Sequence, residues 1–191
     1  MSFNPQLADS DGRKHYPSNW PNHYVSNDAS RFVARYRIAK AAEINFDSGI
    51  SGQIGNAYSA FTKLFLAYSA FEVFQKAFSL SSDDINSLDN QYSGSNVVAG
   101  LKRLHDESPN FFPFIQSQLN SGPAKKNIDR FVTGNSVTAL SLAKSFRHIF
   151  AHGMLTPSSD GSDSQITKRI GDVLYDHIMK IMDAEASLLA K

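Results

Sequence analysis

The chain has 191 residues, of which 41% are hydrophobic, 12% aromatic and 19% charged, and its formal net charge at pH 7 is +1. This length is typical of one globular domain with a sizeable core. The small net charge argues against a nucleic-acid coat protein and against a polybasic membrane binder. The chain contains no cysteine, which excludes disulfide bonds, thiol catalysis and cysteine-ligated zinc.

The start of the sequence, residues 1–5, lacks the basic-then-apolar pattern of a signal peptide. No apolar run approaches the roughly 20 residues of a membrane span. We therefore expect a cytoplasmic protein with no membrane contact.

Residues 1–27 differ in composition from the rest of the chain and form a predicted N-terminal arm. The segment carries prolines and large aromatic residues, among them Pro5, Pro17, Pro21, Tyr16, Trp20 and Tyr24. The proline spacing excludes a long helix. The aromatic residues favour an arm laid on the domain or on a neighbouring subunit, and a disordered tail is the alternative.

Residues 28–191 read as a single helical domain without internal repeats or strand-like alternation. Apolar residues at helical spacing predict long helices over 28–46, 52–79 and 164–189, and a fourth that starts after Thr133-Gly134-Asn135 and ends near residue 153. Shorter helices are expected over 96–105 and 114–119, with a polar connection from Ser81. The predicted fold is all-α, an antiparallel four-helix-type bundle with extra short helices and the extended arm.

Glu72 lies at the centre of an aromatic stripe on the second predicted helix. Phe61 and Phe65 fall within about 20° of it on a helical projection, and Tyr68 within about 40°. A carboxylate is costly to bury without a partner. Glu72 therefore either lies at an open end of the stripe or meets a cation.

The stretch 145–153, Ser-Phe-Arg-His-Ile-Phe-Ala-His-Gly, concentrates an arginine and two histidines. In an unbroken helix Arg147 and His152 would point about 140° apart, whereas His148 and His152 would share a face. Gly153 is typical of a helix end with a left-handed cap, where the bend of the chain can redirect His152. An arginine suits phosphoryl oxygens and a histidine suits proton transfer near neutral pH.

A metal site is a weaker interpretation of the same histidines. His148 and His152 have the spacing of paired helical ligands, but the glutamate that follows the first histidine in zinc-protease helices is absent. A third ligand would have to come from elsewhere in the chain, for instance Glu72 or His177. His177 falls on the apolar stripe of the last helix, where a core histidine with a hydrogen-bond partner is the ordinary reading. We expect no metal and no cofactor.

The pattern Arg147, four residues, His152-Gly153 resembles the hallmark of the HEPN superfamily, the higher-eukaryote and prokaryote nucleotide-binding domains. The helix around Ala67–Glu72 also resembles the long earlier helix of such domains, where a glutamate commonly sits near the motif. The position after the arginine is often asparagine in that family and is His148 here. The resemblance implies an all-α bundle and a homodimer that brings two motifs into one cleft.

What the resemblance implies for function is metal-independent RNA cleavage. His152 would exchange protons with the 2′-hydroxyl or the leaving oxygen, Arg147 would stabilise the phosphorane charge, and Glu72 would hold either residue in place. Family members also occur as toxins neutralised by a nucleotidyltransferase-like antitoxin. Candidate contacts for an RNA or nucleotide ligand are His148, Lys144, Lys125 and Lys126.

Two alternatives remain open at the level of sequence. Arg147 could pair with Glu72, and His152 could interact with the helix dipole, in a HEPN-like module that binds nucleotides or proteins without catalysis. The basic cluster at Lys125 and Lys126 could equally be a solvated helix face.

Overall fold

The computed structural model describes residues 27–44, 46, 52–155 and 163–189. Of the N-terminal arm expected over residues 1–27, residues 1–26 lie outside these ranges, and Asn27 begins the first helix. Within these ranges the chain is all-α, which confirms the all-α part of the predicted fold class. The helices are α1 (Asn27–Ala41), α2 (Gly52–Ala77), α3 (Ser82–Gln91), α4 (Gly94–Glu107), α5 (Phe111–Gln118), α6 (Pro123–Val132), α7 (Ala139–Ala151) and α8 (Ser164–Leu189).

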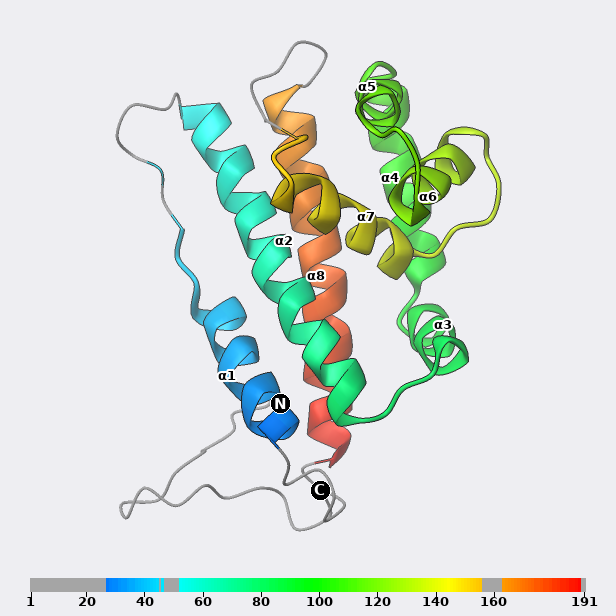
Figure 1. The fold of residues 1–191 in the computed structure, drawn as a ribbon. Coiled ribbons are helices and arrows are strands. Elements are labelled where there is room, and N and C mark those ends of the chain that lie inside the picture. The colour runs from blue at the N-terminus through cyan, green and yellow to red at the C-terminus, as the bar shows by residue number, and fades with distance from the viewer. Residues whose placement is uncertain (1–26, 45, 47–51, 156–162, 190–191) are drawn as a thin grey trace.

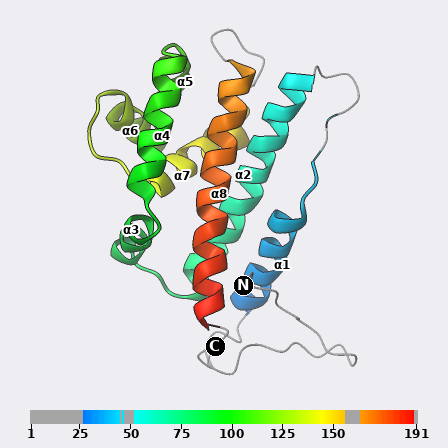
Figure 2. The ribbon, with the colours of Figure 1, turned by 180° about the vertical axis from the view of Figure 1, so that it is seen from behind.

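The two longest helices, α2 and α8, form the centre of the molecule. They run side by side in the same direction, and α1 packs antiparallel to α2 on its other side (Figure 1). Helix α7 crosses over α2 and α8 on one face, and the shorter helices α3 to α6 lie to one side of α8, as the reverse view also shows (Figure 2). No helix of the described residues has the length and apolar character needed to cross a bilayer.

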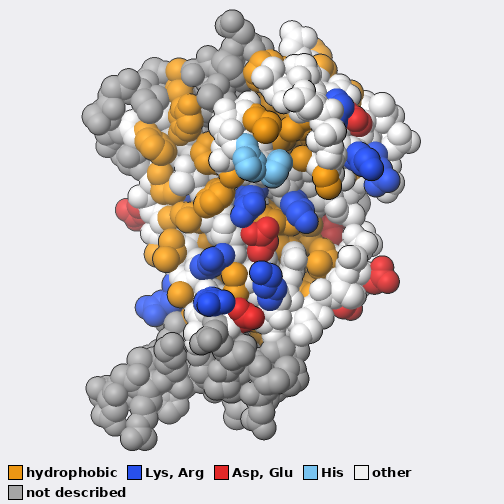
Figure 3. Space-filling view, in the orientation of Figure 1, with side chains coloured by type: hydrophobic (Ala, Val, Ile, Leu, Met, Phe, Trp, Pro, Cys, Tyr) orange, Lys and Arg blue, Asp and Glu red, His pale blue; other side chains and the backbone are white. Residues whose placement is uncertain are grey.

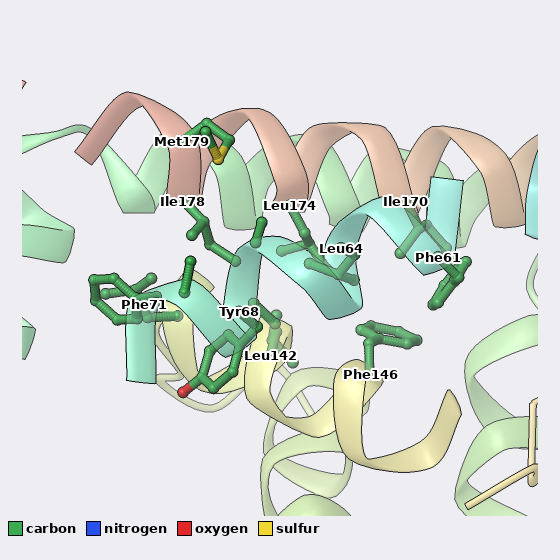
Figure 4. Close-up of a cluster of buried hydrophobic side chains, with 14 of the residues drawn as sticks. Phe61, Leu64, Tyr68, Phe71, Leu142, Phe146, Ile170, Leu174, Ile178 and Met179 are labelled. Carbon is green, nitrogen blue, oxygen red and sulfur yellow. The ribbon is translucent and has the colours of Figure 1, made fainter. Parts of the chain in front are cut away.

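The core lies where α2 is enclosed between α8 and α7 (Figure 4). Phe61 and Leu64 of α2 are fully buried, and Phe146 of α7 packs edge-on against Phe61 with ring centroids 5.9 Å apart. Gly171 lets α8 approach α2 closely, because a Cβ there would lie 3.0 Å from the Cβ of Ala60. Close packing of these apolar residues supplies the main driving force for the fold.

Several helices differ from the sequence prediction, and α6 (Pro123–Val132) was not predicted. The first helix ends at Ala41 rather than near residue 46. The expected polar connection after Ser81 is helix α3, which starts with a capping box in which the Ser81 hydroxyl accepts from the Asp84 N–H and the Asp84 carboxylate accepts from the Ser81 N–H. Gly134, at φ 76°, terminates α6, so the turn at 133–135 ends one helix, and α7 starts only after the Thr138 cap.

A buried carboxylate fixes the start of α7. Asp89 of α3 is 1% exposed and accepts hydrogen bonds from the backbone N–H groups of Ala139 (3.2 Å) and Leu140 (3.1 Å). Its other close partner is the equally buried His177 of α8, whose Nε2 lies 2.9 Å from Asp89 Oδ1. The interpretation of His177 as a core histidine with a partner is thereby confirmed. Through Asp89, the helix that carries the Arg147 motif is tied to both α3 and α8.

Candidate functional site

The end of α7 has the geometry that Gly153 predicts. Gly153 has a φ of 67°, its N–H donates to Phe150 O, and the Met154 N–H donates to Ile149 O. These two bonds form a Schellman motif, which satisfies the last carbonyl groups of the helix. His152 is therefore the C-cap residue of α7, at the point where the chain turns away from the helix axis.

Glu72 and Arg147 form an ion pair between α2 and α7. The Arg147 Nη2 atom lies 3.1 Å from Glu72 Oε2, and the two side chains are 27% and 32% exposed. The cation expected opposite the carboxylate on the aromatic stripe is thus Arg147. Because only one guanidinium nitrogen contacts Glu72, the remaining N–H groups are not committed to that carboxylate.

Aromatic residues of α2 surround this ion pair. The Arg147 guanidinium lies over the Phe65 ring, with its Cζ 5.3 Å from the ring centroid, a distance at which cation–π attraction is significant. Burial, followed by the negative charge of Glu72, raises the pKa of the Tyr68 hydroxyl well above its usual value, so this phenol is neutral at physiological pH. Phe65 and Glu72 therefore hold the guanidinium from two directions.

His148 and His152 lie together at the exposed end of α7, with ring centroids 4.4 Å apart in an edge-on arrangement. Burial, the neighbouring His152 and the charge of Arg147 together lower the pKa of His148. His148 is thus predominantly neutral at pH 7. Half-buried Phe150 anchors this end of the helix through ring contacts with Phe61 (5.7 Å) and Tyr58 (6.4 Å) of α2.

Arg147 and His152 are not joined by any contact among the described residues. Arg147 turns towards α2, whereas His152 faces His148, consistent with the wide angle that helix geometry predicts. Histidine side chains lie next to lysine and arginine side chains on the face where α7 crosses α2, with an acidic side chain among them (Figure 3). Within one chain the two motif residues therefore border the same surface without meeting.

The remaining predicted contact residues divide between two places. Lys144 and His148 line one pocket with Arg147 on the side of α7 that faces α6. Lys125 instead lies 3.6 Å from Asp129 and donates to Gln116 O, so it does not belong to this pocket. Lys126 is exposed on α6 and does not line it either.

Sequence reasoning missed three residues that shape this region. Asp89 positions the start of α7, and Asn127 and Ser145 form the wall of the pocket. A buried histidine on the α8 stripe was the one signal for an acidic partner, but it did not indicate which carboxylate. In the part of the chain that the structure describes, no group of three or more potential ligands could hold a metal ion.

We compared the chain with models of known protein families, with curated proteins and with solved structures, and none of the three comparisons found a match.

Proposed function

We propose that this protein is a metal-independent endoribonuclease of the HEPN type. The observation that carries the proposal is the Glu72–Arg147 ion pair beside His148 and His152. It combines a held guanidinium, exposed imidazoles and an orienting carboxylate on one face, which are the groups that cleavage by the 2′-hydroxyl requires.

In the proposed reaction the ribose 2′-oxygen attacks the adjacent phosphorus and the bond from phosphorus to the 5′-oxygen breaks. The products are a 2′,3′-cyclic phosphate and a 5′-hydroxyl end. His152 takes the proton of the 2′-hydroxyl or gives a proton to the leaving 5′-oxygen, with solvent water serving the other transfer, and its exposure leaves the imidazole accessible to RNA. Arg147 stabilises the charge on the phosphorane, and Glu72 fixes the direction of its guanidinium.

Basic residues around Glu72 favour a polyanionic substrate. Arg35 of α1 donates to the carbonyl of Ser69, one turn before Glu72 on α2. Lys76 is exposed one turn after Glu72. With Arg147 these side chains form a local basic surface on a chain whose total charge is only +1, and phosphate contacts of this kind supply most of the non-specific affinity for nucleic acid.

A homodimer is part of the proposal, because Arg147 and His152 of one chain do not meet. Two α7 ends facing each other would bring the Arg147 of one subunit towards the His152 of the other. Partly exposed Phe65 and Phe150 and exposed Met154 border the same end of the site and offer apolar surface for such an interface.

The test is an RNA cleavage assay in excess EDTA with a single-stranded RNA and the DNA of the same sequence. The proposal predicts that RNA is cut and DNA is not, because DNA lacks the attacking 2′-hydroxyl, and that the fragments end in 2′,3′-cyclic phosphate. Cleavage of both substrates, or cleavage that chelation abolishes, would contradict it. Absence of any cleavage would leave a HEPN-like binding module.

A further inference from the structure

A pocket of about 160 Å³ lies between the first turns of α6 and the outer side of α7. Helix α6 contributes Pro123, Ala124 and Asn127. Helix α7 contributes Lys144, Ser145, Arg147 and His148. The pocket therefore lies between α6 and α7, whereas Phe65 and Glu72 contact Arg147 from α2.

The polar wall of the pocket is held in place by its own hydrogen bonds. The Asn127 Nδ2 atom donates to Ser141 O (3.2 Å) and to Ser145 Oγ (3.1 Å). The Ser145 hydroxyl donates in turn to Ser141 O at 2.8 Å. Because both amide hydrogens of Asn127 are used within the wall, its position does not depend on a ligand.

The charged groups around the pocket are basic, and none of its lining residues is acidic. Lys144 is exposed and forms no ion pair with any described residue. Arg147 contacts Glu72 through Nη2 only, while its Nε is buried and has no hydrogen-bond partner among the described residues. A buried N–H donor without an acceptor costs free energy, so the contacts among the described residues do not satisfy all the donors of this guanidinium.

The start of α6, at one end of the pocket, also favours a negatively charged ligand. The residue before α6 is Gly122, and the helix starts without any side-chain hydrogen bond to its first N–H groups. Such N–H groups attract negative charge. Volume limits the occupant, because sites that enclose a whole drug-sized molecule span about 300–1,000 Å³, well above the size of this pocket.

We propose that the pocket between α6 and α7 binds a single phosphate group, through Lys144, Arg147 and His148. The group is the terminal phosphate of an RNA or of a free nucleotide, whose base and sugar remain outside the pocket. Assigning it to RNA rests on the proposed function, whereas phosphate binding itself does not.

The direct test is titration of the full-length protein with inorganic phosphate, followed by amide NMR. Wild-type protein should show saturable shifts for the N–H groups of Ala124 and Lys125 and for the side-chain amide of Asn127. Lys144→Gln should weaken binding at least about tenfold, the contribution of one charged hydrogen bond. Lys102→Gln makes the same charge change at an exposed position of α4. It should alter the affinity for phosphate less than about twofold.

The phosphate titration is independent of the proposed function, because it requires no cleavage of RNA. Saturable binding that Lys144→Gln weakens would support the pocket assignment whether or not the protein cleaves RNA. Two results would overturn the inference: no saturable shift in wild-type protein up to about 50 mM phosphate, or equal affinity in Lys144→Gln and Lys102→Gln. The NMR spectrum itself reports whether each variant is folded.

The two sources of phosphate are distinguished with 2′-O-methyl RNA, which cannot be cleaved. If the pocket binds the end of an RNA, a 5′-phosphorylated oligonucleotide should bind at least about tenfold more tightly than its 5′-hydroxyl form. Lys144→Gln should remove this difference. If the pocket instead binds a free nucleotide, AMP should bind as tightly as the phosphorylated oligonucleotide. Equal binding of both oligonucleotides with no binding of AMP would contradict the pocket assignment.

Discussion

The Arg147 guanidinium lies 3.1 Å from the Glu72 carboxylate, and this contact joins the end of α7 to the middle of the molecule. Both side chains keep about a third of their surface exposed, so solvent screens the pair and its contribution to stability is small. Its consequence is positional. Glu72 and Phe65 contact the guanidinium from α2 and fix its direction.

Glu72→Gln should therefore reduce RNA cleavage much more than it reduces stability. Loss of the charged partner lets the guanidinium move, and a misplacement of about 1 Å can cost roughly a hundredfold in rate. The free energy of unfolding should change by less than about 1 kcal/mol. Single-turnover cleavage and urea denaturation measure the two effects.

The matched control for this variant is Glu107→Gln, which removes the carboxylate of another surface ion pair, with Arg169 of α8. That pair lies outside the site, so cleavage should stay at the wild-type rate. Equal cleavage by Glu72→Gln and Glu107→Gln would remove Glu72 from the mechanism.

Asp89 should be among the most important polar residues for stability. In Asp89→Ala the first N–H groups of α7 and the buried His177 lose their acceptor. Removing one member of a buried pair typically costs about 3–5 kcal/mol. Urea unfolding should report a loss of that size, whereas Asp106→Ala, at an exposed position of α4, should change the unfolding free energy by no more than about 0.5 kcal/mol. Similar effects for both variants would show that Asp89 does not hold α7.

Two glycines of α4 provide an internal comparison. A Cβ at Gly94 would lie 2.1 Å from Asp89 Oδ2, whereas a Cβ at Gly100 would meet nothing within 4 Å. Gly94→Ala should destabilise the protein by about 1–3 kcal/mol, because Asp89 must move out of its hydrogen bonds. Gly100→Ala should stabilise it by up to about 1 kcal/mol, the helix preference of alanine. Thermal denaturation giving the same sign for both would contradict this packing.

His148 should titrate below the ordinary histidine value of about 6.5. Burial is the first cause, and the charges of His152 and Arg147 add to it. The folded protein thus binds fewer protons than the unfolded chain just below pH 6.5, so the contribution of His148 to stability decreases as pH falls through this window. Histidine NMR titration measures the midpoint, and His152→Ala should raise it. A wild-type midpoint at or above 6.5 would be inconsistent with this environment.

The sequence predicted what depends on local pattern. Helix α8 spans the expected residues, and Glu72 pairs with a cation, which is one of the two outcomes that its place on the aromatic stripe allowed. The missed features depend on tertiary contacts. Nothing near Asp89 in the sequence indicates that it caps a helix fifty residues later, and the pocket exists only because Asn127 of α6 packs against Ser145 of α7.

Helix starts and stops were also hard to separate by sequence. Gly134 and Thr133 form a turn that ends α6, yet the same residue types precede helices. The capping box of Ser81 and Asp84 was present in the sequence, but a run of four polar residues resembled a loop. Helices α2 and α8 pack parallel because helices α3 to α7 connect the end of α2 to the start of α8 at the other end of the molecule. No local sequence pattern specifies this connection.

The central claim is that His152 and Arg147 cleave RNA without a metal. The most direct measurement compares wild-type protein with His152→Ala, Arg147→Ala and Arg103→Ala, an exposed α4 control, on one labelled single-stranded RNA in excess EDTA. Loss of an acid or base should lower the rate about 10²–10⁴-fold, and loss of the charge-stabilising donor about 10²–10³-fold. Arg103→Ala should match wild type, and circular dichroism should show all four proteins folded. Wild-type cleavage that persists unchanged in His152→Ala would contradict the account.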